Sequence, residues 1–202
     1  MRAPTDGSTL MELGSHILSM LPSGARDRPS GMAFPDSFTT ARVQAERLTP
    51  AHLSELRRMH TDPVVMAHLG GLRTPDQTAA YLDRNLRHWE EQGFGLWIVR
   101  ELDGGEPIGR ALLRTLRLDG IDEIEVGYAL YEPYWGRGLA TEITAACLTF
   151  ARENLRRTTA VAVTSPTNFA SQRVLQKSGL VYERDIDHEG ALAALFRVRW
   201  TA

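Results

Sequence analysis

The sequence predicts an α/β protein, and three features of the chain lead to this prediction. A strand, a glycine-bearing turn and a helix follow one another within residues 123–150. The first half of the chain carries helix-start signals in which threonine or aspartate precedes proline. The second half contains short β-rich segments separated by Asp-Gly and Gly-Gly turns. With 202 residues, the chain is long enough for one domain with a sizeable core.

The strand–turn–helix unit is the best-defined part of this pattern. Apolar side chains alternate with other residues from Ile124 to Leu130, and a period of two predicts a strand. Pro133 ends this strand, because proline cannot donate a hydrogen bond to a neighbouring strand. From Leu139 to Phe150 the apolar residues recur at helical spacing. The chain therefore passes from a strand through a turn into a helix.

The turn in this unit has the features of an anion-binding site. Gly136 and Gly138 lack Cβ atoms, so a ligand can approach the main chain closely. The first N–H groups of the following helix have no partner within the helix and lie at the positive end of its dipole. Arg137 adds a positive charge, whereas the Lys-Ser/Thr pair of a P-loop is absent and Thr141 replaces the third glycine of a dinucleotide-binding turn. These features favour a pyrophosphate site over a turn that merely connects a strand to a helix.

Composition limits the expected partners and compartment. The net charge of −2 gives no reason to expect a nucleic-acid or membrane partner. No apolar run reaches the roughly 18 residues of a membrane span, and the N-terminus lacks the pattern of a signal peptide, so a cytoplasmic location is expected. The one cysteine, Cys147, lies on an apolar helix face and is expected to be a buried thiol rather than a nucleophile. No metal is expected, because no paired ligand spacing links the histidines, which are His16, His52, His60, His68, His88 and His188.

The first part of the chain divides into an extension, residues 1–37, and the start of a domain, residues 38–202. Apolar residues between Leu10 and Leu21 predict a helix that is either loosely attached or packed on the domain or on a partner. A strand is expected from Phe38 to Arg47. Helices are then expected to open at Thr49-Pro50, at Asp62-Pro63 and at Thr74-Pro75, the last with a capping box and a stop at Gly93.

The second part of the chain is expected to contain mainly strands. Gly109 interrupts one of them, which predicts a bulge or tight packing. The full order is therefore a strand, two or three helices, a three-stranded meander, a helix, a strand, a helix and a hairpin. The further strands are expected at 94–102, 107–118, 158–163, 180–186 and 191–200, and the further helix at 169–177.

The turn also carries a family resemblance. Its sequence Trp-Gly-Arg-Gly-Leu-Ala, residues 135–140, resembles the pyrophosphate loop of GNAT N-acetyltransferases, Gln/Arg-x-x-Gly-x-Gly/Ala. Trp135 in place of Gln or Arg is typical of the RimJ/RimL-type branch. The element order is similar to the GNAT fold, a mixed, mostly antiparallel central sheet with helices on both faces and a splayed strand pair for acyl-CoA. The resemblance covers roughly residues 38–200 and includes short motifs at 93–97, 108–109, 125–128 and 168–179.

The resemblance implies acetyl-CoA as cosubstrate. The pyrophosphate would lie on the backbone of residues 136–141, and the pantetheine amides would pair with the strand edge at residues 126–130. Asn168 matches a family asparagine that contacts the CoA arm, although it is also suited to a simple helix N-cap. The implied cofactor-binding residues are Val126, Tyr128, Leu130, Trp135, Gly136, Arg137, Gly138, Leu139, Ala140, Thr141, Asn168 and Ser171.

The implied reaction is direct acyl transfer to an amine, with Glu125 as the best candidate for the general base. Glu125 is out of phase with the apolar face of its strand and could accept a proton directly or through one water, or be a solvated or ion-paired residue. Glu123, on the same face, is the fallback. Ser171 matches a serine of the RimJ/RimL-type branch and could protonate the thiolate or bind CoA. Leu175 stands where many GNATs carry a tyrosine acid.

These features predict an N-acetyltransferase that acts on a primary amine, either a protein N-terminus or a small molecule. Two alternatives remain open at this point. One is a non-catalytic acyl-CoA-binding sensor on the same fold, and the other is an aminoglycoside-type acetyltransferase, which an acidic acceptor pocket would support. Neither nucleic acid nor membrane is expected as a partner, and a homodimer is possible.

Overall fold

The computed structural model describes residues 36–201, which form one mixed sheet with helices on both faces. The strands are β1 (Ser37–Thr39), β2 (Val43–Arg47), β3 (Leu96–Glu101), β4 (Gly109–Leu118), β5 (Ile121–Leu130), β6 (Thr159–Thr164), β7 (Val181–His188) and β8 (Ala191–Arg199). The helices are η1 (Pro50–His52), α1 (Leu53–His60), α2 (Pro63–Met66), α3 (Pro75–Gln92), η2 (Glu132–Tyr134), α4 (Leu139–Glu153) and α5 (Phe169–Lys177).

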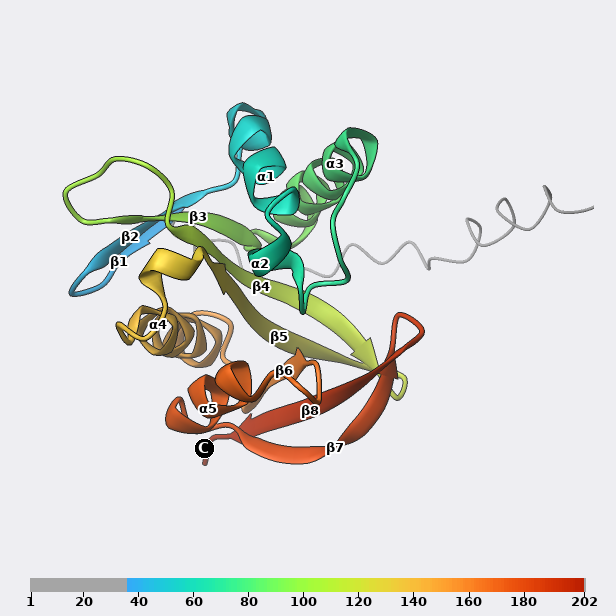
Figure 1. Cartoon of the computed structure of the whole chain (residues 1–202). Coiled ribbons are helices and arrows are strands. Elements are labelled where there is room, and N and C mark those ends of the chain that lie inside the picture. Colours follow the sequence, from blue (N-terminus) through green and yellow to red (C-terminus); the bar gives the residue numbers. More distant parts are fainter. Residues whose placement is uncertain (1–35, 202) are drawn as a thin grey trace, which may run out of the picture. The chain divides into compact units, whose positions relative to one another are not determined.

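The sheet has the predicted mixed, mostly antiparallel character. Its strand order is β1-β2-β3-β4-β5-β6-β8-β7, and β5 and β6 form the one parallel pair among these described strands. Helices α1, α2 and α3 lie on one side of the sheet, and α4 and α5 lie on the other (Figure 1). The predicted fold class is therefore confirmed.

The expectation of a single strand from Phe38 to Arg47 is wrong, because the chain turns back between β1 and β2. In this turn the Thr40 hydroxyl accepts a hydrogen bond from the Val43 N–H (3.2 Å) and donates one to Glu142 Oε1 (2.6 Å). The main-chain N–H of Arg42 donates to the same oxygen at 2.9 Å. The turn contains no glycine or proline and is held by a side chain about 100 positions away, so local sequence gives no sign of it.

Two expectations concern the segment 1–37. The predicted helix between Leu10 and Leu21 lies outside the described residues. Ser37, assigned above to the extension, pairs with Glu46 in the β1–β2 hairpin. The sheet therefore begins inside the segment expected to be an extension.

The predicted helix starts on the α1–α3 side are confirmed by their capping contacts. Asp62 Oδ1 accepts a hydrogen bond from the Val64 N–H at 2.9 Å and so caps α2. The Thr74 hydroxyl accepts from the Gln77 N–H (3.2 Å), and the Gln77 side chain accepts from the Thr74 N–H (2.9 Å), which completes a capping box. Gly93 ends α3 with φ of 78°, a value that favours glycine.

Aromatic side chains join the two helix layers through the sheet. Trp97 of β3 packs edge-on against Trp89 of α3, with ring centroids 5.2 Å apart, and against Phe150 of α4 at 5.9 Å. Cys147 lies in the same core, and burial raises the pKa of its thiol to about 12. The expectation of an inert, buried thiol is therefore confirmed.

Tight packing at Gly109 is also confirmed. A Cβ atom on this residue would lie 2.1 Å from the Ala129 carbonyl oxygen and 2.6 Å from a Leu130 methyl group. Only glycine therefore allows β4 to approach β5 at this point.

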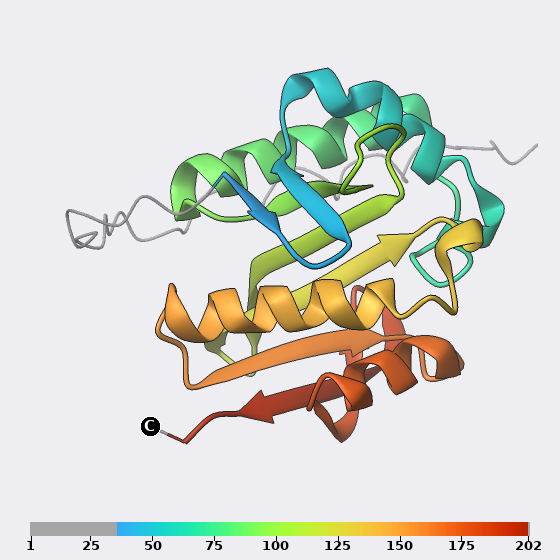
Figure 2. The same cartoon turned by 90° about the vertical axis from the view of Figure 1, so that its left-hand side faces the viewer.

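The parallel pair β5 and β6 separates along its length. Among the described residues, the two strands pair at Glu125 and Val161 and at no later position. In Figure 2 the carboxyl end of β5 rises away from β6, with α4 lying across the two strands. The remainder of β5 therefore has a neighbouring strand, β4, on one edge alone.

Candidate active site

The turn between β5 and α4 has the geometry of an anion site. Gly136 and Gly138 have φ of 71° and 78°, in the left-handed region that favours glycine. A Cβ atom at Gly136 would meet no atom of the protein within 4 Å. Gly138 occupies the N-cap position of α4, and no side chain of the described residues caps this helix. The free N–H groups of the first turn therefore suit the pyrophosphate of CoA.

A second arginine lies beside this turn, and the sequence analysis missed it. Arg42 Nη1 donates to the Arg137 carbonyl oxygen at 2.7 Å, and Arg42 Nη2 lies 2.6 Å from Glu142 Oε2. A Cβ atom on Gly138 would lie 3.4 Å from Arg42 Nη2. Arg42 precedes the turn by 95 residues, and no local pattern marks it. Arg137 itself is turned toward Glu101, with 2.5 Å between Nη2 and Oε1.

Beyond the pairing of Glu125 with Val161, the main chain of β5 has no neighbouring strand, within residues 36–201, on the edge that faces β6. The Tyr131 N–H donates to the Ile108 carbonyl at 3.0 Å, and this bond fixes which residues of β5 point toward β4. By the alternation of antiparallel ladders, the N–H and C=O groups of Val126, Tyr128 and Leu130 point the other way. These are the residues to which the pantetheine contacts were assigned. The Trp135 indole already donates to the Leu130 carbonyl at 2.8 Å.

Asn168 and Ser171 lie at the start of α5. Asn168 Oδ1 accepts from the Ser171 N–H at 3.0 Å, so Asn168 is the N-cap of the helix. Burial raises the pKa of Tyr128 above its ordinary value, and a hydrogen bond with the Ser171 side chain partly opposes this shift. The Tyr128 and Ser171 hydroxyl groups therefore meet between β5 and α5. Leu175, in the position of the family tyrosine, is buried in the core.

The two candidate bases both form ion pairs. Glu125 is 6% exposed, and its Oε2 accepts a hydrogen bond from Arg114 Nε. Burial lowers the pKa of Arg114. The charge of the Glu125 carboxylate and its hydrogen bond raise this pKa by more, so that it lies above the ordinary value. Glu123 pairs with Arg197 and accepts a hydrogen bond from the Thr159 hydroxyl at 2.9 Å.

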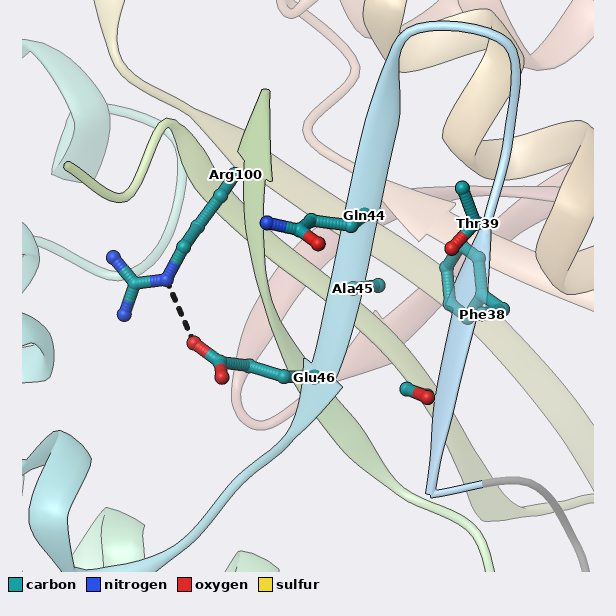
Figure 3. A pocket seen from close by; sticks show the side chains of 7 residues that line it. Phe38, Thr39, Gln44, Ala45, Glu46 and Arg100 are labelled. Carbon is teal, nitrogen blue, oxygen red and sulfur yellow. Dashed lines mark hydrogen bonds and ion pairs between the residues drawn. The ribbon is translucent and has the colours of Figure 1, made fainter. Parts of the chain in front are cut away.

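A small cavity at the β1–β2 hairpin is separate from these residues. It has a volume of about 120 Å³ and lies beside Gln44, Glu46 and Arg100 (Figure 3). The guanidinium group of Arg100 pairs with Glu46 at 2.7 Å and with Glu55 at 2.6 Å. Its charge is therefore already balanced within the protein.

Two classes of feature are not found in the described part of the chain. Residues 36–201 contain no group of three His, Cys, Asp or Glu side chains placed to hold a metal ion. None of the helices between these limits has both the length and the apolar character that crossing a bilayer requires.

Comparison with known proteins identifies the family. Residues 42–181 match the acetyltransferase (GNAT) domain family. The Bacillus subtilis (strain 168) protein YkkB is 30% identical over 128 residues, which are 63% of this chain and 74% of that protein. An acetyltransferase from Agrobacterium tumefaciens str. C58 superposes with a TM-score of 0.73 at 24% identity, over 86% of this chain and 99% of its own.

The structural likeness extends to enzymes with different acceptors. RimL, a ribosomal alpha-N-protein acetyltransferase, superposes with a TM-score of 0.66 at 13% identity, over 80% of this chain and 96% of its own. An aminoglycoside acetyltransferase gives a TM-score of 0.66 at 18% identity, over 78% and 94%. Both structures contain coenzyme A. At these identities the likeness shows a shared fold.

The fold and the family match define an acyl-CoA-dependent acetyltransferase. The chain belongs to the GNAT acetyltransferase family.

Proposed function

We propose that this protein transfers an acetyl group from acetyl-CoA to a primary amine, in the manner of the RimJ/RimL-type branch. The main support is the unpaired edge of β5, which connects the uncapped start of α4 with Glu125. A ligand with a pyrophosphate at one end and an extended, amide-bearing arm fits such an edge, because the arm can pair with it as a strand would. Trp135 in the turn supports the branch assignment.

The residues around the gap have distinct roles in this proposal. Glu125 accepts a proton from the acceptor ammonium, directly or through one water. Its Oε2 is held by Arg114, so Oε1 is the atom available for this task. The N–H of Tyr128 or Leu130, which points into the gap, donates to the oxyanion that develops on the thioester carbonyl. Ser171, whose hydroxyl group is hydrogen-bonded to Tyr128, protonates the departing thiolate in this proposal.

The nature of the acceptor sets how much work Glu125 must do. An N-terminal α-amine has a pKa of about 7.7–8.0 and is partly neutral at pH 7, whereas a lysine amine has a pKa of about 10.4. A thiol with a pKa of about 8.5 leaves without a strong acid. An α-amine acceptor therefore needs the least help, which suits a site with a single buried carboxylate at the strand edge.

The proposal is tested by thiol release from acetyl-CoA with a panel of amines, together with CoA binding by calorimetry. Gly138→Asp should weaken CoA binding by about 100-fold, because it places a carboxylate where phosphate lies and removes charge-assisted hydrogen bonds. Gly120→Asp is the matched control, since Gly120 has φ of 80° in a surface turn with no atom near its Cβ position. Equal CoA affinity in the two variants would refute the cofactor assignment.

A further inference from the structure

The face of the sheet that carries Glu125 also carries an arginine cluster, which we define as Arg73, Arg84 and Arg110. All three guanidinium groups lie over the ring of Tyr81 in α3, at 4.6, 5.4 and 5.8 Å from its centroid. Three cations around one ring repel one another unless an anion lies between them. The sequence separates these residues, and the packing of α3 on β4 brings them together.

Within residues 36–201, none of these charges has an ion-pair partner. In the described part of the chain, no carboxylate forms an ion pair with any member of the cluster. Arg110 is 7% exposed, and its Nε is buried without a hydrogen-bond partner. A buried cation without a partner costs folding free energy. The cluster therefore has the character of a binding site that a ligand completes.

The histidine beside the cluster does not supply the missing negative charge. Arg73 Nη1 lies 3.0 Å from His60 Nε2, which must accept, because arginine has no acceptor atom. His60 Nδ1 then carries the proton and donates to the Thr78 hydroxyl at 3.0 Å. Burial, then Arg73 and Arg110, lower the pKa of His60 to about 4, so the ring is neutral at pH 7.

The cluster lies next to the proposed site of acyl transfer. In the β4–β5 ladder Arg110 pairs with Ala129, and Arg114 pairs with Glu125. Side chains of alternate residues share one face, so Arg110, Arg114 and Glu125 lie on the same face of the sheet. Between the two pairs stands Gly127, where a Cβ atom would meet only Leu112, at 3.6 Å or more. Along β5 no side chain therefore stands between Ala129 and Glu125, whereas on β4 the Leu112 side chain lies between Arg110 and Arg114.

The balance of charge on this face is positive. Glu125 is engaged by Arg114, Glu189 from the β7–β8 turn acts on Arg73 and Arg114, and Glu91 of α3 acts on His88. Burial lowers the pKa of Arg73, Arg110 and Arg84 lower it further, and Tyr81 and Glu189 oppose these effects without reversing them. One distant carboxylate therefore does not neutralise the cluster.

We propose that the acceptor is an anionic amine, a primary amine whose carboxylate or phosphate group binds to Arg73, Arg84 and Arg110 while the amine lies near Glu125. This inference rests on the proposed acetyl transfer and narrows its substrate class. Guanidinium groups bind carboxylate and phosphate oxygens with paired, charge-assisted hydrogen bonds. Arg110 lies four residues from Arg114 along β4, about 13 Å between Cα atoms. The anion and the amine of the ligand are therefore several bonds apart. A polycationic aminoglycoside is repelled by the same charges.

The test compares matched acceptors by the rate of thiol release from acetyl-CoA. The C-terminally amidated peptides Ser-Glu-Glu-Ala and Ser-Gln-Gln-Ala differ in charge alone, and phosphoethanolamine, ethanolamine and spermidine provide the small-molecule arm. The anionic member of a pair should have kcat/KM about 10–100-fold higher, the effect of one or two charge-assisted hydrogen bonds. The peptides test whether the anionic amine is a protein N-terminus, and the other acceptors test whether it is a small molecule.

Arg110→Met and a control, Arg117→Met, make the test specific. Arg110→Met should bring the ratio of anionic to neutral acceptor close to one, mainly through KM, and should leave the melting temperature unchanged or higher, because an unpaired buried cation is removed. Arg117 is an exposed residue of the same strand, paired with Asp122, and its replacement should preserve the ratio. Equal use of anionic and neutral acceptors, or an equal effect of Arg110→Met on both, would overturn the inference.

A binding measurement separates this inference from the proposed function. Calorimetry with the same peptides, in the presence of CoA, should show Arg110-dependent binding of the anionic peptide whether or not turnover occurs. If no amine is acetylated but this binding is found, the acetyl transfer proposal fails and the anionic site stands. If acetylation occurs without any preference for charge, the acetyl transfer proposal stands and the anionic site is refuted.

Discussion

The two sides of β5 are built by different means. Its edge toward β6 offers main-chain N–H and C=O groups, and the turn that follows offers the N–H groups of α4. The face toward α1–α3 offers side chains instead, above all Glu125 of β5 together with Arg110 and Arg114 of the neighbouring strand β4. The main-chain site comes from one contiguous segment, whereas the side-chain site gathers residues between positions 60 and 189. A backbone site can therefore be recognised from a short motif, and a side-chain site requires the folded chain.

The largest effect is expected at Glu125, where the main-chain edge of β5 meets its side-chain face. Glu125→Gln keeps the size of the side chain and removes its basicity, so turnover should fall by about 10²–10⁴-fold, the usual contribution of a general base. The loss should shrink as pH rises toward the pKa of the acceptor amine, because the neutral amine then forms without help. A pH–rate profile of both proteins on one acceptor measures this.

Glu123→Gln is the matched control for Glu125→Gln. Both changes disrupt a partly buried ion pair on the same face of β5, with Arg197 in one case and Arg114 in the other. Both should therefore lower the melting temperature, but turnover should fall in the Glu125 variant alone. The reverse result would assign the role of base to Glu123.

The fold could be predicted from sequence wherever its signals are local. The capping box at Thr74 and the glycine stop at Gly93 gave α3 correctly, because both act within one turn of the helix. The β1–β2 turn was missed, because it is held by Glu142 from a distant helix. On the site, the family resemblance implied the edge residues of β5, and their contact with CoA stays a prediction. Arg42 was missed, since its importance depends on where β2 packs.

The arginine cluster that would bind the acceptor could not be predicted from sequence, because it too depends on contacts between distant parts of the chain. Arg73 and Arg110 are two of many arginines in the chain, and nothing near either of them in sequence shows that they share one aromatic ring. The burial of Arg110 could not be predicted from the sequence either, because strand β4 mixes charged and apolar residues on one face. Tertiary contacts alone decide which of these charges are left without a partner.

The charge of the acceptor side can be measured through His60. Its pKa of about 4 lies below the ordinary 6.5, so His60 binds a proton less readily in the folded protein than in the unfolded chain. Stability from this residue is therefore lost as pH falls from about 6.5 toward 4. Between pH 7 and pH 5 the free energy of unfolding should drop by about 2 kcal/mol more in the wild type than in His60→Leu.

Denaturant titrations of both proteins at pH 7 and at pH 5 measure this difference. The contacts that His60→Leu loses lower its stability equally at both pH values, so they cancel when each protein is compared with itself. NMR titration adds a direct measure, in which Arg110→Met should raise the pKa of His60 by removing one of its positive neighbours. An unchanged pKa in Arg110→Met would show that burial alone sets it, and that the cluster is weaker than its geometry indicates.

A smaller effect is expected on the main-chain side from Arg42→Met. This change removes the guanidinium group that binds the Arg137 carbonyl and Glu142, so the turn loses both support and positive charge. CoA affinity should fall by about 10-fold, as for the loss of one charge-assisted hydrogen bond. Arg47→Met, in the same hairpin but paired with Asp36, should leave CoA affinity unchanged. Calorimetry that finds the two variants alike would remove Arg42 from the cofactor site.

The smallest effect is expected from removing residues 1–35. Both sides of β5 lie wholly within the GNAT domain, whose first strand begins at Ser37. The extension is linker-like in composition, so we expect the shortened protein to melt cooperatively, to bind CoA with unchanged affinity and to keep its acceptor preference. Deletion through residue 40 is the informative comparison, because it removes β1 and the Thr40 contact with Glu142 beside the turn. Deletion through residue 40 should weaken CoA binding. If instead the protein without residues 1–35 no longer melts cooperatively, the extension is part of the core.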